Sequence, residues 1–269
     1  MNNRQNLKYE QNFWGACQCM LTVIYALILR ETVTLYGDRK LGYLWVIIQT
    51  MFNISIFACL RYFLGATNMG GLPTIYFLLI GFTCWNIFDE CIVKCLKAVS
   101  ANSSLLEFPH VHPIDVLLAR CLLIVATHVS TAVIIIIGGM FCGVDFEITH
   151  FDDFTILLLL TIILSFSSAI FLASLNVYYQ SVGKFLPFIM RGLFFVSGVF
   201  FSIGKFPSSW KQYLELNPIL NIIEGMRNAV SHTFCNTFNS NYFYISFISI
   251  TLLCFGLLLE KASHRRFEL

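Results

Sequence analysis

The sequence predicts an all-α, polytopic integral membrane protein with six transmembrane helices, an N-terminal interfacial helix and an outer re-entrant helical hairpin. Two compositional features predict this class: 57% of the 269 residues are hydrophobic and only 12% are charged. The third observation is that the apolar residues form long runs. A hydrocarbon core about 30 Å thick needs roughly 20 apolar residues in helical form, because lipid offers backbone amides no hydrogen-bond partner. A soluble protein would show shorter runs with polar stripes at helical spacing.

The whole chain, residues 1–269, is expected to form a single transmembrane domain. Its first helix, 13–30, is a marginal span. If it crossed the bilayer, the basic stretch 30–40 would lie on the far side, against the cytoplasmic bias of Lys and Arg. We therefore expect this helix to lie in the cytoplasmic interface. Six spans are expected to follow, at about 41–64, 73–97, 114–142, 154–180, 185–203 and 242–261.

The distribution of Lys and Arg predicts that both termini are cytoplasmic. Basic residues precede the first span, flank the second–third and fourth–fifth connections, and close the chain. The first outer loop, 65–72, has no Lys or Arg, and the second, 143–153, carries only acidic charges. The third outer region, 204–241, is the exception because it holds three basic residues. This asymmetry fixes the expected orientation.

The third outer region is too apolar to be a simple loop. Trp210–Leu216 and Ile219–Val230 each read as a helix too short to cross, and Pro218 suits the first turn of the second. We expect a re-entrant hairpin over 207–232, enclosed by protein or by a water-filled cavity. The alternative is an amphipathic loop that rests on the outer surface.

Ionisable residues within spans are expensive and indicate a lumen. Those in this chain are Arg61, Asp89, Glu90, Arg120 and Arg191. Two pairs have spacings at which the charges can neutralise each other on one helix face, Glu90 with Lys94 and Glu224 with Arg227. The ten cysteines fall mostly in apolar runs, so we expect buried thiols, with no disulfide framework and no metal site.

Three motifs occur in order along the chain. Residues 30–45 read R-E-x-x-x-x-Y-x-x-x-x-L-G-x-L-W, and residues 108–116 read F-P-x-V-x-P-I-D-V. The third is Phe195–Phe201, followed by Asn217-Pro218. Together they resemble the membrane permease subunits of bacterial capsule polysaccharide ABC exporters, over about residues 28–230.

The resemblance implies a homodimer in the bacterial inner membrane that works with a separate cytoplasmic ABC ATPase subunit. The substrate would be a lipid-linked polysaccharide, and periplasmic-adaptor and outer-membrane export proteins are further possible partners. The sequence agrees with that division of labour, because it contains no G-x-x-x-x-G-K-[ST] phosphate loop. We therefore expect no catalytic residue and no cofactor in this chain, with ATP and Mg²⁺ bound by the partner, and no nucleic acid.

The cytoplasmic segment 99–113 is expected to contact the ATPase, and its two prolines would stiffen the connection so that a push moves the spans. The residues assigned to this coupling are Asn102, Leu106, Glu107, Phe108, Pro109 and His110. Basic side chains near the inner leaflet can attract lipid phosphate or acidic sugars, and aromatic rings can stack on sugars. The residues assigned to substrate entrance and channel are Arg30, Glu31, Tyr36, Arg39, Lys40, Trp45, Tyr62, Trp85 and Arg191. Topology signals, interfacial anchors and simple packing are the alternative roles.

Other functions remain open from the sequence. A permease for O-antigen, teichoic acid, lipid or drugs belongs to the same class. An integral-membrane enzyme acting on lipid-linked sugars would need an acidic pair with a positioned His. The adjacent pairs Asp89–Glu90 and Asp152–Asp153 have no such His nearby in sequence. A secondary transporter would show internal repeats, and we find none.

Overall fold

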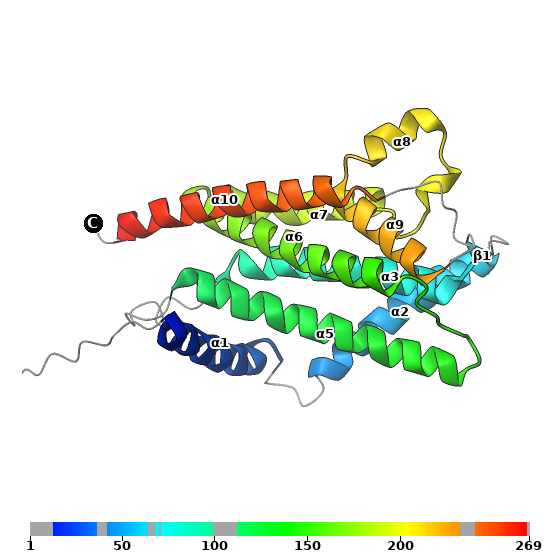
Figure 1. Cartoon of the computed structure of the whole chain (residues 1–269), viewed down its shortest axis with the longest axis horizontal. Helices are drawn as coiled ribbons and strands as arrows, with labels where there is room; N and C mark the ends of the chain where they lie inside the picture. The colour runs from blue at the N-terminus through cyan, green and yellow to red at the C-terminus, as the bar shows by residue number, and fades with distance from the viewer. Residues whose placement is uncertain are drawn as a thin grey trace, which may run out of the picture.

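The computed structural model describes residues 13–36, 42–63, 68–69, 71–98, 112–231 and 240–267, and nearly all of them are helical (Figure 1). The long helices are α1 (Phe13–Tyr36), α2 (Gly42–Phe63), α3 (Thr74–Cys95), α5 (Pro113–Phe141), α6 (Phe151–Tyr178) and α10 (Tyr242–Phe267). The shorter ones are α7 (Ser181–Val196), α8 (Ser208–Leu214), α9 (Pro218–Val230) and the 3₁₀ turn η2 (Ile203–Lys205). Two short strands, β1 (Asn68–Met69) and β2 (Leu72–Pro73), pair antiparallel.

Five helices in the described ranges are long and apolar enough to cross a membrane, namely α2, α3, α5, α6 and α10. They correspond to the first four predicted spans and the last, with ends that differ by a few residues. The prediction of an all-α polytopic membrane protein is confirmed. The number of six spans stays a prediction, because α7 has 16 residues and reaches only about 24 Å.

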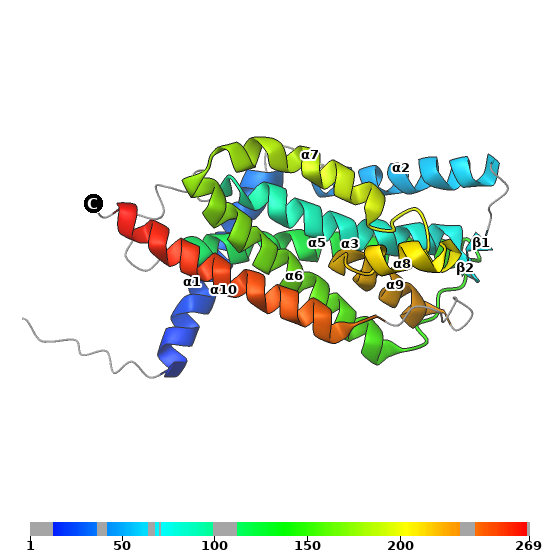
Figure 2. The same ribbon diagram turned by 90° about the horizontal axis from the view of Figure 1, so that it is seen from above.

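The helices pack in a consistent order. α6 lies between α10 and α3, α3 lies between α6 and α5, and α1 packs on α5. Figure 2 shows α1 crossing the bundle steeply at the end where α10 also finishes, whereas α8, α9 and the two strands lie at the opposite end. We call these the α1 end and the α9 end. The steep crossing suits the interfacial position predicted for α1, which stays a prediction.

Small side chains let α6 approach its neighbours closely. Ser165, Ser168, Ala169 and Ala173 are all buried on this helix. The Ser165 hydroxyl donates to the carbonyl oxygen one turn earlier at 2.6 Å, so its burial leaves no unpaired polar group. On α10, a Cβ at Gly256 would lie 2.9 Å from the backbone nitrogen of the facing α6 residue. Close packing of small residues is the usual basis of helix association in lipid.

The predicted span 185–203 is wrong at both ends. Helix α7 begins at Ser181 and ends at Val196, and the chain then turns through Gly198, whose φ is +75°. Glycine adopts this left-handed conformation without strain, and a residue with this φ cannot belong to a right-handed helix, so α7 ends before it. The apolar run beyond Val196 is therefore a loop, although the sequence reads as a helix there.

The loop after α7 lies within the bundle, where lipid cannot hydrogen-bond its backbone carbonyl groups. One side chain donates hydrogen bonds to these carbonyls instead. Arg227 of α9 is fully buried, and its Nη1 donates to the carbonyl oxygens of Gly198 and Phe201 at 2.8 and 3.2 Å. Its Nη2 donates to the oxygens of Val199 and Phe77 at 2.9 and 3.1 Å. The guanidinium also lies over the Phe77 ring, 3.4 Å from the centroid. We call Arg227 with these partners the Arg227 hub. It replaces the hydrogen bonds that a longer helix would have made internally.

Both short helices predicted in this region are present, as α8 and α9, and their insertion as a re-entrant hairpin stays a prediction. Asn217 caps α9 by accepting from the backbone N–H of Ile219 at 3.1 Å, and Pro218 occupies the first turn. Glu224 pairs with Arg227 at 3.1 Å as the spacing predicted, and it also accepts from the Ser202 hydroxyl at 2.9 Å. α9 is enclosed by α3, α6 and α10, whereas α8 projects from the bundle (Figure 1).

The Arg227 hub makes Gly81 of α3 sensitive to substitution. A Cβ at this position would lie 2.8 Å from Nη2 of Arg227 and 3.1 Å from the carbonyl oxygen of Val199. Neither atom can move freely, because Nη2 of Arg227 donates a hydrogen bond to the Val199 oxygen. We expect Gly81→Ala to destabilise the protein by roughly 1–3 kcal/mol and to lower the thermal midpoint in detergent, measured as the retained monodisperse fraction in size-exclusion chromatography.

Gly138→Ala on α5 is the matched control, because a Cβ there meets nothing within 4 Å. It is expected to be neutral or stabilising by up to about 1 kcal/mol. Equal thermal midpoints for the two variants would contradict the hub.

Candidate functional site

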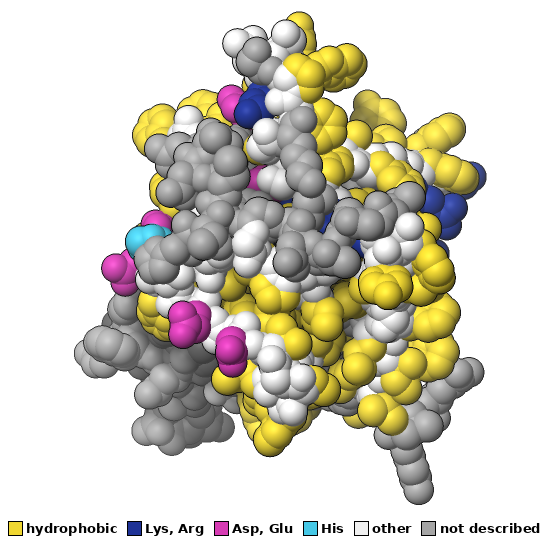
Figure 3. Space-filling view, turned by 90° about the vertical axis from the view of Figure 1, so that its right-hand side faces the viewer, with side chains coloured by type: hydrophobic (Ala, Val, Ile, Leu, Met, Phe, Trp, Pro, Cys, Tyr) yellow, Lys and Arg dark blue, Asp and Glu magenta, His cyan; other side chains and the backbone are white. Residues whose placement is uncertain are grey.

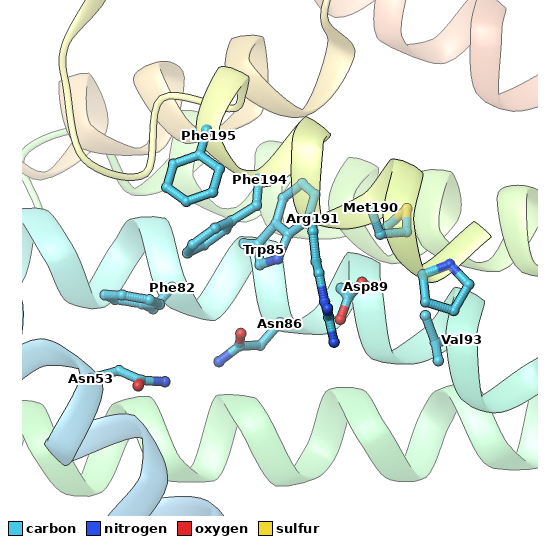
Figure 4. A pocket seen from close by; sticks show the side chains of 11 residues that line it. Asn53, Phe82, Trp85, Asn86, Asp89, Val93, Met190, Arg191, Phe194 and Phe195 are labelled. Atoms are coloured by element: carbon cyan, nitrogen blue, oxygen red, sulfur yellow. The ribbon is translucent and has the colours of Figure 1, made fainter. Parts of the chain in front are cut away.

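A cavity of about 510 Å³ opens between α2, α3 and α7 (Figure 4). Its lining is Asn53, Phe82, Trp85, Asn86, Asp89, Val93, Pro187, Met190, Arg191, Phe194 and Phe195. A volume of this size is typical of sites for small molecules or for part of a larger ligand. The lining combines aromatic rings with amide and charged groups.

The aromatic part of the lining belongs to a larger cluster of rings. Trp85 and Phe194 have centroids 5.4 Å apart, and Phe200 lies 4.9 Å from Phe194 and 4.1 Å from Phe57. Because Phe200 belongs to the loop that Arg227 holds, the hub also fixes this cluster. The rings therefore form a continuous apolar wall between α3 and α7.

The polar part of the lining carries both signs of charge. Figure 4 shows Arg191 of α7 extending along the cavity beside Asp89 of α3, with Asn53 and Asn86 further along the same space. Charged groups at membrane depth are costly and mark sites of function. Amide and charged groups beside aromatic rings can hydrogen-bond the hydroxyl or acidic groups of a sugar while the rings stack on its apolar face.

Of the residues predicted to contact substrate, the structure brings two to this cavity, Trp85 and Arg191. Trp45 and Tyr62 lie near opposite ends of α2 and are 66% and 72% exposed, so they do not line it. Exposed aromatics at the ends of a span are typical interfacial anchors, the alternative role that the sequence left open.

The basic motif at the end of α1 is described only in part. Arg30 is exposed, whereas Arg39, Lys40 and the side chain of Tyr36 lie outside the described residues. Glu31 is 2% exposed and binds a buried arginine on α5. Its carboxylate is therefore committed within the protein, and we assign it a structural position in place of the substrate contact that the sequence predicted. The residues predicted to contact an ATPase also lie outside the described residues: Asn102, Leu106, Glu107, Phe108, Pro109 and His110.

The expectation that no histidine is placed beside the Asp89–Glu90 pair is wrong. His128 of α5 lies with Nε2 3.2 Å from Oε2 of Glu90, and Lys94 donates to the same carboxylate oxygen. No spacing along the chain indicates this contact, because the two residues lie on different helices. His128 is 3% exposed, and neither it nor Glu90 lines the cavity. Glu90 and Lys94 are 24% and 31% exposed, so the trio forms a half-buried network next to the cavity and is not part of its lining.

Sequence reasoning missed the two asparagines of the cavity. Asn53 and Asn86 are polar residues inside long apolar runs. A polar residue in such a run could have been read as a sign that it lines a cavity. It also missed the approach of Cys121 to Cys95, whose sulfur atoms are 3.6 Å apart between α5 and α3. Within the described ranges, no group of three or more His, Cys, Asp or Glu side chains is arranged to hold a metal ion.

The chain matches a known family over most of its length. The family described as ABC-2 type transporter matches residues 22–230. The polysialic acid transport protein KpsM of Escherichia coli is 28% identical over 238 residues, which cover 88% of this chain and 92% of that protein.

Two further relatives carry names of the same kind. The capsule polysaccharide export inner-membrane protein CtrC of Neisseria meningitidis serogroup B is 26% identical over 254 residues, 93% of this chain and 94% of the relative. The capsule polysaccharide export inner-membrane protein BexB of Haemophilus influenzae is 24% identical over 244 residues, 89% of this chain and 90% of the relative. The chain therefore belongs to the ABC-2 type transporter family of membrane proteins.

Proposed function

We propose that the chain is the membrane-spanning subunit of an ATP-driven exporter that carries lipid-linked capsular polysaccharide across the bacterial inner membrane. The observation that carries this proposal is the cavity between α2, α3 and α7, where aromatic rings are combined with amide and charged groups. The names of the three relatives, which cover nearly the whole chain, favour capsule over O-antigen, teichoic acid, lipid or drug export. A separate ATPase subunit would bind ATP and Mg²⁺ and supply the energy.

The proposed subunit works as a homodimer. The cavity lies at one side of the single chain, where Figure 2 shows α2 and α7 together and away from α10. A second copy facing this side across a two-fold axis would turn the open cavity into the wall of an enclosed channel. A polymer-sized path does not fit inside one thin bundle, so closure by a partner copy is the natural solution. Periplasmic-adaptor and outer-membrane proteins would continue the path.

The proposed orientation places the α1 end in the cytoplasm. Exposed basic residues of the described part gather at that end, among them Arg30, Lys97, Lys184 and Lys261. The α9 end carries the acidic loop between α5 and α6, and Figure 3, which views that end, shows Asp and Glu side chains together with some Lys and Arg among hydrophobic ones. This asymmetry agrees with the excess of Lys and Arg on the cytoplasmic side of membrane proteins. The segment that joins α3 to α5 also begins and ends at the α1 end, where a cytoplasmic ATPase would reach it.

If the cavity binds polysaccharide, Arg191→Gln should impair export. Loss of a charge-assisted hydrogen bond is worth about 1.5–3 kcal/mol, so we expect export by reconstituted transporter to fall roughly tenfold or more. Assembly with the ATPase subunit should be unchanged, because Arg191 is exposed on α7.

Lys184→Gln is the matched control, because this exposed cation lies on the same helix outside the cavity lining. It should export as the unmodified protein does. Equal export by both variants and the unmodified protein would remove the cavity from the transport path.

If segment 99–113 receives the ATPase, Phe108→Ala and Glu107→Lys should weaken that contact. An aromatic anchor at an interface contributes about 2 kcal/mol or more, so Phe108→Ala should reduce the ATPase subunit that co-purifies several-fold. Glu107→Lys should lower ATP turnover of the assembled complex. Glu147→Lys, the same charge change at an exposed position of the α9 end, is the control. Unchanged assembly and unchanged turnover in both variants would end the coupling assignment.

A further inference from the structure

A buried ion pair joins α1 to α5. Arg120 donates from Nε to Oε2 of Glu31 at 2.8 Å and from Nη2 to Oε1 at 2.9 Å. The two side chains are 5% and 2% exposed. The ion pair is thus bidentate, with two hydrogen bonds joining the guanidinium to the carboxylate. A bidentate pair restrains the relative orientation of the two side chains as well as their separation, because both groups are planar and are shielded from water.

The same guanidinium reaches a third helix. Nη1 of Arg120 donates to the carbonyl oxygen of Lys94 at 2.9 Å, and Lys94 lies in the last turn of α3. Arg120 itself lies about two turns from the start of α5. One side chain therefore holds the body of α1 to the last turn of α3 and the first turns of α5. We call Arg120 with Glu31 and the Lys94 carbonyl the Arg120 clamp.

The part of α3 that the clamp holds is also the wall of the cavity. Asp89 and Val93 line the cavity, and Glu90 and Lys94, the residues that follow them, form the ion-pair network with His128 of α5. This stretch of α3 is therefore bonded to α5 on one side and faces the cavity on the other. A displacement of α5 relative to the rest of the bundle has to carry this stretch with it.

We propose that Arg120 is a positioning residue that makes α1 and the adjoining ends of α3 and α5 move as one body. Segment 99–111 connects Ala98 to His112, so its two ends enter this body directly. A force applied to the segment then displaces the cavity wall at Asp89 and Val93, because the joined helix ends cannot tilt independently of one another. The inference rests on the proposed function, because it presumes that an ATPase subunit delivers the push there.

The test uses the full chain with its ATPase subunit in proteoliposomes, and it measures ATP turnover and polysaccharide exported per ATP. Arg120→Lys keeps the charge but removes the planar fork, and Glu31→Gln keeps the shape but removes the charge. Both should assemble and hydrolyse ATP within about twofold of the unmodified protein, while export per ATP falls roughly fivefold to tenfold. Glu215→Gln, at an exposed position beyond α8, is the matched control and should leave that ratio unchanged.

The exchange Glu31→Arg with Arg120→Glu separates positioning from simple stability. It restores an ion pair between α1 and α5, so export per ATP should rise above that of either single variant. It should stay below the unmodified value, because Arg120→Glu removes the donor to the Lys94 carbonyl.

Export per ATP that is unchanged in both Arg120→Lys and Glu31→Gln overturns the inference and leaves the proposed function intact. Loss of assembly in every variant, without recovery in the exchange, also overturns it, because the role would then be structural only. An unmodified complex that hydrolyses ATP but moves no polysaccharide would instead refute the proposed function, and the inference with it.

Discussion

The buried guanidinium of Arg227 is the interaction on which the α9 end of the molecule depends. A loop among helices at membrane depth leaves carbonyl groups that neither lipid nor water can satisfy. Arg227 collects the carbonyl oxygens of Gly198, Val199 and Phe201 with a single side chain, and Glu224 balances its charge. α9 must therefore lie inside the bundle, because only from there does its arginine reach the loop and α3 together. α8 carries no such group and projects from the bundle.

The cavity is a consequence of the same constraint. Because α7 ends at Val196, its last turns pack beside the middle of α3, and Phe194 meets Trp85 there. Arg61 of α2 donates to the carbonyl oxygen of Phe200, which ties α2 to the same loop. A continuous α7 would have carried Phe200 away from its contacts with Phe57 and Phe194. The short helix and the held loop thus decide where aromatic and charged groups come to share one space.

Sequence reasoning succeeded where the signal was local and failed where it depended on contacts between helices. The apolar runs gave the long helices, Asn217 with Pro218 gave the start of α9, and the three-residue spacing gave the Glu224–Arg227 pair. The end of α7 was missed because an apolar run looks the same in a helix and in a loop whose carbonyls are bound by a distant arginine. The Glu90–Lys94 pair was predicted from its spacing, but Arg120 as the partner of Glu31 and His128 as a second partner of Glu90 were missed, because both lie on α5 and no spacing along one helix reveals them.

Two classes of charged residue can be separated by their surroundings. Glu224 with Arg227, and Glu31 with Arg120, have matched internal partners and almost no exposure, so their charges serve to fix backbone positions. Desolvation makes such pairs costly to break and unavailable to a ligand. Asp89 and Arg191 instead face a cavity with room for a guest. The paired charges therefore fix helix positions at the two ends of the bundle, whereas Asp89 and Arg191 stay accessible in the cavity between them. This arrangement suits a transporter, because a displacement of the clamped ends of α1, α3 and α5 would reach the cavity wall at Asp89 and Val93.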